Sequence, residues 1–231
     1  MTARSLVIFD CDGVLVDSER LTVEIEARYL AEIGWPLSPD DIVERFLGRT
    51  EDVMVAAIED QIGRPVSTEW RRRWLADTEA ALDESLEAVP GISDAIDALV
   101  HAGYAICVGS SGRPEKIERN LTTTGLLTRF DVDGAAGTIG RQHALFSAVE
   151  VVRGKPEPDL FLLAAETMGI GAGRCVVVED SRYGVTAALA AGMRVIGFSG
   201  GLTKAADLDA ADLVISDMGE LPTAAAALVQ S

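Results

Sequence analysis

The stretch that decides the fold is residues 6–13, which read Leu-Val-Ile-Phe-Asp-Cys-Asp-Gly. A short apolar run that ends in such breaker residues is typical of a buried strand. Asp10 and Asp12 then follow the carboxyl end of that strand, where open α/β sheets place their ligands. Two carboxylates this close repel each other unless a positive group lies nearby. The pattern indicates a functional site, although an acidic turn is the alternative on this motif alone.

Further apolar runs along the chain predict the rest of a sheet. They are separated by helix-like patterns, for example over 92–101 and 160–168. Alternation of this kind predicts an α/β fold, a Rossmann-like parallel sheet with helices on both faces. The expected strands after the first are 104–108, 175–178, 195–198 and 213–215, with a weaker one at 132–136.

One interval breaks this alternation. Between residues 18 and 88 no convincing strand is found, and these roughly seventy residues exceed what a βαβ crossover needs. We predict a helical cap at 18–88, inserted into a Rossmann-like catalytic core formed by 1–17 and 89–231. Trp70 and Trp74 lie one helical turn apart in the cap. We assign both to the core of the cap, with contact to a substrate as the alternative.

Length, charge and cysteine content narrow the class of protein. The 231 residues suit one domain with an insertion, and the net charge of −17 argues against a nucleic-acid partner. No run reaches the roughly eighteen apolar residues of a membrane span, and no signal peptide is recognised. The three cysteines fall in or beside apolar runs, which predicts free thiols and a cytoplasmic location. We expect a monomer or weak dimer.

Two later segments offer groups that bind anions. Ser110 and Ser111 follow the run 104–108 and precede Pro114, so that a hydroxyl and backbone N–H groups face a ligand near a helix start. A simple helix cap would use the same residues. Lys155, between a glycine and a proline, could direct its ammonium at a phosphate, although an exposed loop lysine is the commoner case.

A second acidic pair, Glu179 and Asp180, follows the run 175–178. In one sheet with Asp10 and Asp12 it would place four acids at the same edge. Such a cluster is hard to sustain without a cation, and an all-oxygen site with few protein ligands suits Mg²⁺. The alternative for Glu179 and Asp180 is that they only bond nearby backbone amides.

Taken in order, these motifs resemble those of the haloacid dehalogenase superfamily of phosphohydrolases. The likeness runs essentially end to end and is greatest to the branch of β-phosphoglucomutases and phosphosugar phosphatases, which carry a helical cap after the first strand. The resemblance implies that Asp10 is the nucleophile and that Asp12 is the general acid and base. It also implies a phosphate site of Ser110, the Ser111 amide and Lys155, and Mg²⁺ held by Asp10, the Asp12 carbonyl, Asp180 and Glu179, the last directly or through water.

The function expected from this resemblance is Mg²⁺-dependent hydrolysis of a small phosphorylated metabolite, a phosphosugar or sugar-acid phosphate, through an aspartyl-phosphate. Three alternatives remain: a β-phosphoglucomutase-type isomerase, a phosphoglycolate phosphatase, and a metabolite-binding regulator without turnover. The mutases carry a cap-hinge histidine where this chain has Thr22, which favours hydrolysis. Asp12 and the acidic metal site disfavour a dehalogenase. Arg49 is the cap residue expected to contact substrate, with a surface salt bridge as the alternative, and Arg113 has the same standing.

Overall fold

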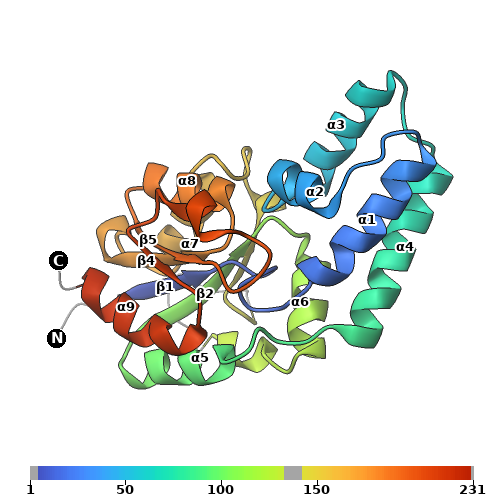
Figure 1. Cartoon of the computed structure of the whole chain (residues 1–231). Helices are drawn as coiled ribbons and strands as arrows, with labels where there is room; N and C mark the ends of the chain where they lie inside the picture. Colours follow the sequence, from blue (N-terminus) through green and yellow to red (C-terminus); the bar gives the residue numbers. More distant parts are fainter. Residues whose placement is uncertain (1–4, 133–141, 230–231) are drawn as a thin grey trace.

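The computed structural model describes residues 5–132 and 142–229. Within them the chain forms a parallel sheet of six strands in the order β3-β2-β1-β4-β5-β6 (Figure 1). The predicted parallel α/β sheet is therefore confirmed. The strands are β1 (Leu6–Phe9), β2 (Ala105–Ser110), β3 (Leu145–Ser147), β4 (Cys175–Glu179), β5 (Arg194–Phe198) and β6 (Leu213–Ile215).

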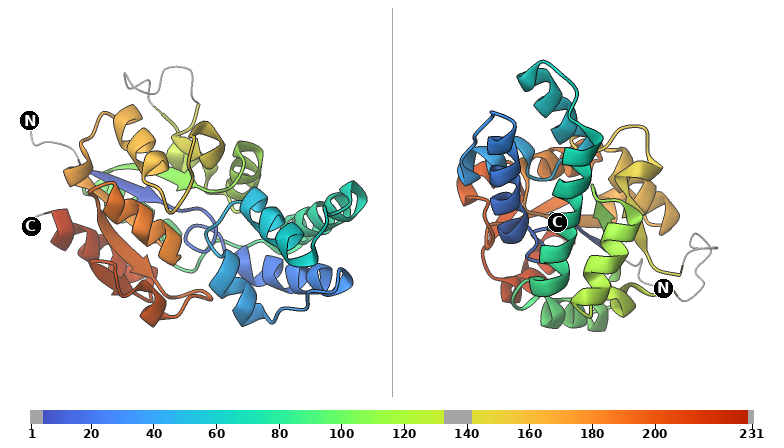
Figure 2. Two further views of the ribbon diagram at one scale, coloured as in Figure 1. Left: turned by 90° about the horizontal axis from the view of Figure 1, so that it is seen from above. Right: turned by 90° about the vertical axis from the view of Figure 1, so that its right-hand side faces the viewer.

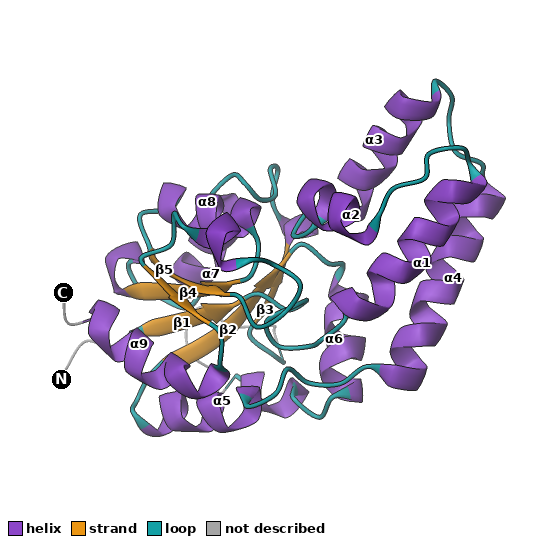
Figure 3. Ribbon diagram, viewed as in Figure 1, coloured by secondary structure: helices purple, strands orange, loops and turns teal. Residues whose placement is uncertain are grey.

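Helices cover both faces of this sheet (Figure 3). Alternate residues of β1 enter two different cores, with Val7 and Phe9 on one face and Leu6 and Ile8 on the other. A strand buried on both faces is apolar throughout, which explains the continuous run in the sequence. The first face is covered by α5 (Ile92–His101), α6 (Pro114–Thr123) and α9 (Leu221–Val229), and the second by α7 (Asp159–Thr167) and α8 (Arg182–Ala190).

The strand order brings three chain segments to one point. β1 lies between β2 and β4, so the residues that follow these strands are neighbours at the carboxyl edge of the sheet. The Asp10 amide, just beyond β1, still donates to the Val178 carbonyl at 2.9 Å. The strand order reverses between β1 and β4, which is where doubly wound sheets form their ligand crevice.

One strand differs from the sequence prediction. The edge strand β3 is Leu145–Ser147, which the sequence did not indicate because three residues are too few to show a periodic pattern. The weaker strand predicted at 132–136 is not supported at Val132, which has no regular structure, and the remainder of that range lies outside the described residues.

Four helices lie between β1 and α5, and we call residues 19–85 the helical segment. They are α1 (Glu19–Glu32), α2 (Pro39–Phe46), α3 (Glu51–Ile62) and α4 (Thr68–Ser85). They enclose an apolar cluster of their own, in which the Tyr29 and Trp70 rings lie 5.6 Å apart. Figures 1 and 2 show this segment beyond the carboxyl ends of the strands, with α1 and α4 side by side. None of the helices in the described residues is both long enough and apolar enough to cross a membrane.

Candidate active site

A buried ion pair lies at the end of β1. Lys155 Nζ donates to Asp10 Oδ1 at 2.8 Å and to Glu179 Oε1 at 2.5 Å, and the Lys155 side chain is inaccessible to solvent. Burial raises the pKa of Asp10 above its ordinary value, against the opposing effect of Lys155. Burial disfavours the charged form of Lys155, but Asp10 and Glu179 outweigh it and raise the lysine pKa. Lys155 is therefore a fixed positive charge beside the Asp10 carboxylate.

Glu179 is held at both of its carboxylate oxygens. Oε1 accepts from Lys155, and Oε2 accepts from the backbone N–H and the hydroxyl of Ser181, each at 2.9 Å. The first turn of α8 passes directly over this carboxylate. A Cβ atom on Gly184 would lie 1.8 Å from Glu179 Oε1, so only glycine fits there. Glu179 thus orients Lys155 and has little capacity left for another ligand.

Asp180 differs from Glu179, because its carboxylate is not held in this way. Both of its carboxylate oxygens are buried, and no N–H or hydroxyl group of the described residues donates to them; the neighbouring Glu19 carboxyl bonds Asp180 only when it is protonated. Burial, and next the Glu19 carboxyl, raise the pKa of Asp180 well above its ordinary value. Buried carboxylate oxygens without a donor are costly, and a cation is the usual reason for them.

The residues around Asp180 fit a small divalent cation. Asp10, Glu179 and Asp180 each offer an oxygen, and these atoms lie within 4.8 Å of one another. Gly13 allows the close approach, since its φ is +77° and a Cβ there would lie 2.0 Å from Asp180 Oδ2. Few carboxylates in a compact all-oxygen site suit Mg²⁺. Asp10, Glu179 and Asp180 therefore offer a set of oxygens that suits the Mg²⁺ expected from the sequence.

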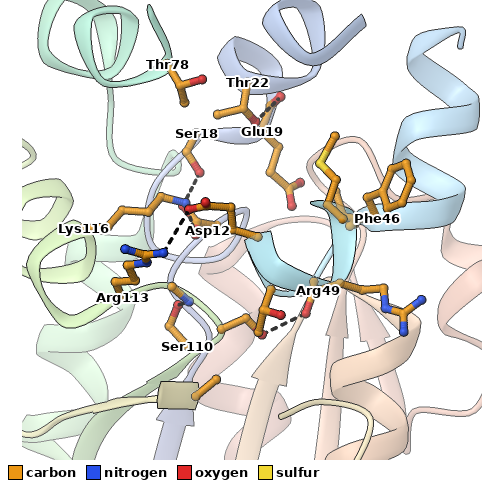
Figure 4. Close-up of a pocket in the computed structure, with 18 of the residues that line it drawn as sticks. Asp12, Ser18, Glu19, Thr22, Phe46, Arg49, Thr78, Ser110, Arg113 and Lys116 are labelled. Carbon is orange, nitrogen blue, oxygen red and sulfur yellow. Dashed lines mark hydrogen bonds and ion pairs between the residues drawn. The ribbon is translucent and has the colours of Figure 1, made fainter. Parts of the chain in front are cut away.

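Asp12 lies apart from this cluster and is surrounded by donors (Figure 4). Oδ1 accepts from the Ser18 hydroxyl at 2.5 Å and from Asn120 Nδ2 at 3.4 Å, and Oδ2 pairs with Lys116 Nζ at 2.8 Å. Burial opposes ionisation, but Lys116 and Ser18 outweigh it, so the pKa of Asp12 lies below its ordinary value. Asp12 is consequently a carboxylate when no substrate is bound.

Of the two predicted serines, Ser110 is the last residue of β2 and Ser111 follows it, at the same edge of the sheet. Ser110 is buried, and its hydroxyl accepts from the Gly112 amide at 3.1 Å, which shapes the tight turn before α6. The Ser111 hydroxyl donates to the Gly48 carbonyl in the helical segment at 2.9 Å. Backbone N–H groups in such a turn, close to a helix start, suit an anion. Both serines line the same cavity as Asp10.

A cavity of about 710 Å³ joins these groups to the helical segment. Asp10, Asp12 and Ser110 line its base, and α1, α3 and α4 contribute its opposite walls. Arg49 also lines it, but its guanidinium stacks on the Tyr183 ring at 4.7 Å, which links the helical segment to α8. Arg113 lies 3.9 Å from Glu51.

Comparison with known proteins identifies the family. Residues 5–192 match the pattern of the haloacid dehalogenase-like hydrolases. The chain belongs to the haloacid dehalogenase-like hydrolase family. This hydrolase is therefore an enzyme, as the sequence predicted, and the family resemblance stated from its motifs is confirmed.

Individual relatives agree with this assignment. The hydrolase is 29% identical to 6-phosphogluconate phosphatase of Escherichia coli, over 86% of the chain and 84% of that protein. It is 34% identical to Protein SUPPRESSOR OF QUENCHING 1, chloroplastic, of Arabidopsis thaliana, over 92% of the chain but only 19% of that longer protein. A crystal structure of a haloacid dehalogenase-like protein of unknown function from Agrobacterium tumefaciens superposes with a TM-score of 0.77. The two sequences are 35% identical, and the superposition covers 98% of this chain and 99% of the Agrobacterium tumefaciens chain.

Sequence reasoning missed several groups at the site of this hydrolase. Ser18, Lys116 and Asn120 contact Asp12, and Glu19 packs against Gly13 beside Asp180. One signal was available. Lys116 and Asn120 are four residues apart at the start of a helix that follows a strand of the site, so they share one helix face.

Proposed function

We propose that this hydrolase is a Mg²⁺-dependent phosphatase that releases phosphate from a small phosphorylated sugar through an aspartyl-phosphate on Asp10. The observation that carries the proposal is Asp180, whose two buried oxygens have no N–H or hydroxyl donor among the described residues, next to an Asp10 held by Lys155. A nucleophilic carboxylate that attacks an anion needs concentrated positive charge, and this site provides one ammonium and the oxygens for a cation.

Three groups would hold the metal: Asp10, Asp180 and the Asp12 backbone carbonyl. Glu179 fits a contact through water, because Lys155 and Ser181 already use both of its oxygens. When bound, Mg²⁺ supplies positive charge that offsets the charge of the phosphoryl group. Lys155, the Ser110 hydroxyl and the Ser111 amide would hold the phosphoryl oxygens on the other side.

In the first step an Asp10 carboxylate oxygen attacks phosphorus, and the bond from phosphorus to the leaving oxygen breaks. Asp12 gives its proton to that oxygen. Asp12 is ionised in the free enzyme, since its pKa is lowered by Lys116 and Ser18. A phosphate dianion in the site raises that pKa, because a neighbouring negative charge favours the neutral acid. Substrate binding would therefore promote protonation of Asp12.

In the second step Asp12, now a carboxylate, takes a proton from water. The water oxygen attacks phosphorus, and the bond from phosphorus to Asp10 breaks. One side chain thus serves as acid and then as base, which the covalent intermediate makes possible.

We also propose that residues 18–88 act as a cap over a core made of 1–17 and 89–231. The two connections between them run side by side, with the Asp17 amide donating to the Glu87 carbonyl at 2.9 Å. Contacts such as Ser111 with the Gly48 carbonyl would hold the cap over the substrate. Closure excludes water and strengthens the charge interactions at phosphorus.

Two observations favour hydrolysis of a phosphosugar over the alternatives. The cavity of about 710 Å³ is larger than phosphoglycolate requires, and one relative is named a 6-phosphogluconate phosphatase. A mutase would need a proton carrier at the cap, but Thr22 lines the cavity and its hydroxyl bonds the Glu19 carbonyl. Neither His101 nor His143 lines the cavity.

The three unpaired, buried cysteines are consistent with a reducing, cytoplasmic location.

The test uses purified enzyme, Mg²⁺ and phosphorylated sugars. We expect phosphate release that stops with excess chelator and with Asp10→Asn, and a phosphoryl group on Asp10 detectable by mass spectrometry after acid quench of Asp12→Asn with an aryl phosphate. Conversion of β-glucose 1-phosphate to glucose 6-phosphate without phosphate release would support a mutase instead. Full activity of Asp10→Asn would reject the mechanism.

A further inference from the structure

The cavity extends beyond the phosphate site to a wall made by α1 and α4. Thr22 and Glu26 of α1 and Trp74 and Thr78 of α4 line this wall. Figure 4 shows Thr22 and Thr78 above Asp12, on the side opposite Ser110. A substrate whose phosphate lies at Asp10 would place its leaving group against this wall.

Trp74 is the first polar group of interest there. The residue is only 4% exposed, and its indole Nε1 is buried without a hydrogen-bond partner. Buried indole N–H groups normally find an acceptor. Trp70, one turn earlier on α4, follows this rule, because its Nε1 donates to the Tyr29 carbonyl at 3.3 Å. The Trp74 N–H therefore lacks the acceptor that a ligand in the cavity would supply.

Thr78 repeats the pattern one turn further along α4. Its hydroxyl oxygen Oγ1 is also buried and has no partner among the described residues. Residues four apart on a helix lie on the same face, so the two unpartnered groups are neighbours on this wall. An indole N–H and a hydroxyl together complement hydroxyl groups on neighbouring carbons of one ligand.

The charges of the cavity indicate whether that ligand is neutral. Arg113, Lys116 and Arg119 line the cavity and each lies beside a carboxylate, whereas Arg49 stacks on a ring and its buried Nε has no hydrogen-bond partner among the described residues. None of these four basic residues belongs to α1 or α4, so the wall made by these two helices offers neutral donors and no cation. The four basic contacts are Arg49 on the Tyr183 ring, Arg113 with Glu51, Lys116 with Asp12 and Arg119 with Asp83.

We propose that Trp74 and Thr78 form a hydroxyl-binding subsite for the neutral polyol end of the substrate. The Trp74 N–H donates to one substrate hydroxyl, and the Thr78 hydroxyl exchanges a hydrogen bond with another. The part of the substrate bound at this wall is then a neutral polyol chain, such as that of a hexitol or aldose monophosphate. This inference rests on the proposed phosphatase activity.

The test compares two substrates in matched variants. Trp74→Phe keeps an aromatic ring but removes the free N–H, and Thr78→Val removes the hydroxyl at nearly constant volume. We expect each to lower kcat/KM for sorbitol 6-phosphate by roughly 3–10-fold relative to its effect on p-nitrophenyl phosphate, which lacks hydroxyls. Thr78→Ser, which keeps the hydroxyl, should restore the wild-type ratio of kcat/KM for sorbitol 6-phosphate to kcat/KM for p-nitrophenyl phosphate. Trp70→Phe is the control, since its N–H already bonds the protein and the ratio should not change.

Two results would overturn the subsite: equal losses on both substrates, or an equal change of the ratio in Trp70→Phe. If the enzyme hydrolyses no phosphate ester, the proposed function fails, and binding then decides the subsite. Asp10→Asn would be titrated with sorbitol 6-phosphate, and the three indole N–H signals followed by NMR. A saturable shift confined to the Trp74 signal supports the subsite, and its absence rejects it.

Discussion

Asp12 illustrates how much a single carboxylate depends on its donors. Lys116, Ser18 and Asn120 keep it ionised and oriented before substrate arrives. If it protonates the leaving oxygen, Asp12→Asn should reduce kcat for alkyl phosphates by roughly 10²–10⁴-fold. Aryl phosphates should lose far less in the phosphorylation step, because their leaving groups need little protonation. The measurement is single-turnover release of alcohol or phenol.

The control for this variant is Asp17→Asn. Asp17 is also an acid at the start of the helical segment, but its carboxylate pairs with Arg20 at 3.2 Å and does not line the cavity. Asp17→Asn should leave unchanged the ratio of kcat for alkyl phosphates to kcat for aryl phosphates. Equal loss on both substrate types in Asp12→Asn would show that Asp12 orients the site and does not transfer the proton.

Gly184 offers a second prediction at the scale of one residue. Alanine is normally more stable than glycine inside a helix by about 1 kcal/mol. At position 184, however, its methyl group would lie 1.8 Å from Glu179 Oε1 and displace the carboxylate that holds Lys155. We expect Gly184→Ala to lower the free energy of unfolding by roughly 1–3 kcal/mol and to reduce activity strongly.

Gly173→Ala is the matched control, because nothing lies within 4 Å of a Cβ at that position. Urea unfolding of the two variants gives the comparison. A Gly184→Ala protein as stable and active as wild type would mean that Glu179 is free to move and does not fix Lys155.

Among the elements, the loop between α2 and α3 contacts the segments that follow β2 and β4. The Gly48 carbonyl accepts from Ser111, and a Cβ on Gly48 would lie 2.1 Å from the hydroxyl oxygen of Ser181. Its φ of +76° also disfavours other residues. If this loop must lie against Ser111 and Ser181 for catalysis, Gly48→Ala should lower kcat/KM at least tenfold.

Gly34→Ala is the control that separates the cost of a strained backbone from the loss of the Gly48 contact. Gly34 has a similar φ of +87°, but nothing lies within 4 Å of its Cβ position. Both alanine variants should lose about 1 kcal/mol of stability from the strained backbone. Only Gly48→Ala should lose activity. Equal kinetic losses in the two variants would mean that the loop contact has no part in turnover.

The same elements show what the sequence could reveal. β1, β2 and β4 were predictable because buried strands are apolar runs, and polar residues that follow them must meet at one edge. Lys116 was not predictable in this way, because its approach to Asp12 depends on how α6 docks. Nor was the need for glycine at 184, which arises from a carboxylate five residues earlier. Such contacts depend on tertiary packing and leave no periodic pattern.

For the whole molecule, the buried acids make stability depend on pH and on metal. Burial raises the pKa of Glu19 to about 8 and that of Asp10 to about 7, so the folded protein retains protons that the unfolded chain has released. Glu19 and Asp10 therefore contribute to the free energy of unfolding in full below about pH 4, where ordinary carboxyls titrate. This contribution is lost as pH rises through 7–8. Asp12, with its lowered pKa, contributes fully above the ordinary carboxyl range and loses this stabilisation only as pH falls below it, so it does not change between pH 5.5 and pH 8. Without divalent cations, the free energy of unfolding should therefore fall from pH 5.5 to pH 8.

Magnesium should oppose this fall, because a cation between Asp10 and Asp180 stabilises the ionised forms. At a hundred times its Kd, binding to the folded state adds about 2.7 kcal/mol. Asp180→Asn gives the decisive comparison. At pH 8 without metal it should have a higher Tm than wild type, since it removes a charge beside Glu19 and Glu179. It should also lose the rise in Tm that Mg²⁺ causes at constant ionic strength. A lower Tm in Asp180→Asn, with the response to Mg²⁺ intact, would mean that Asp180 is a structural acid and that the cation binds elsewhere.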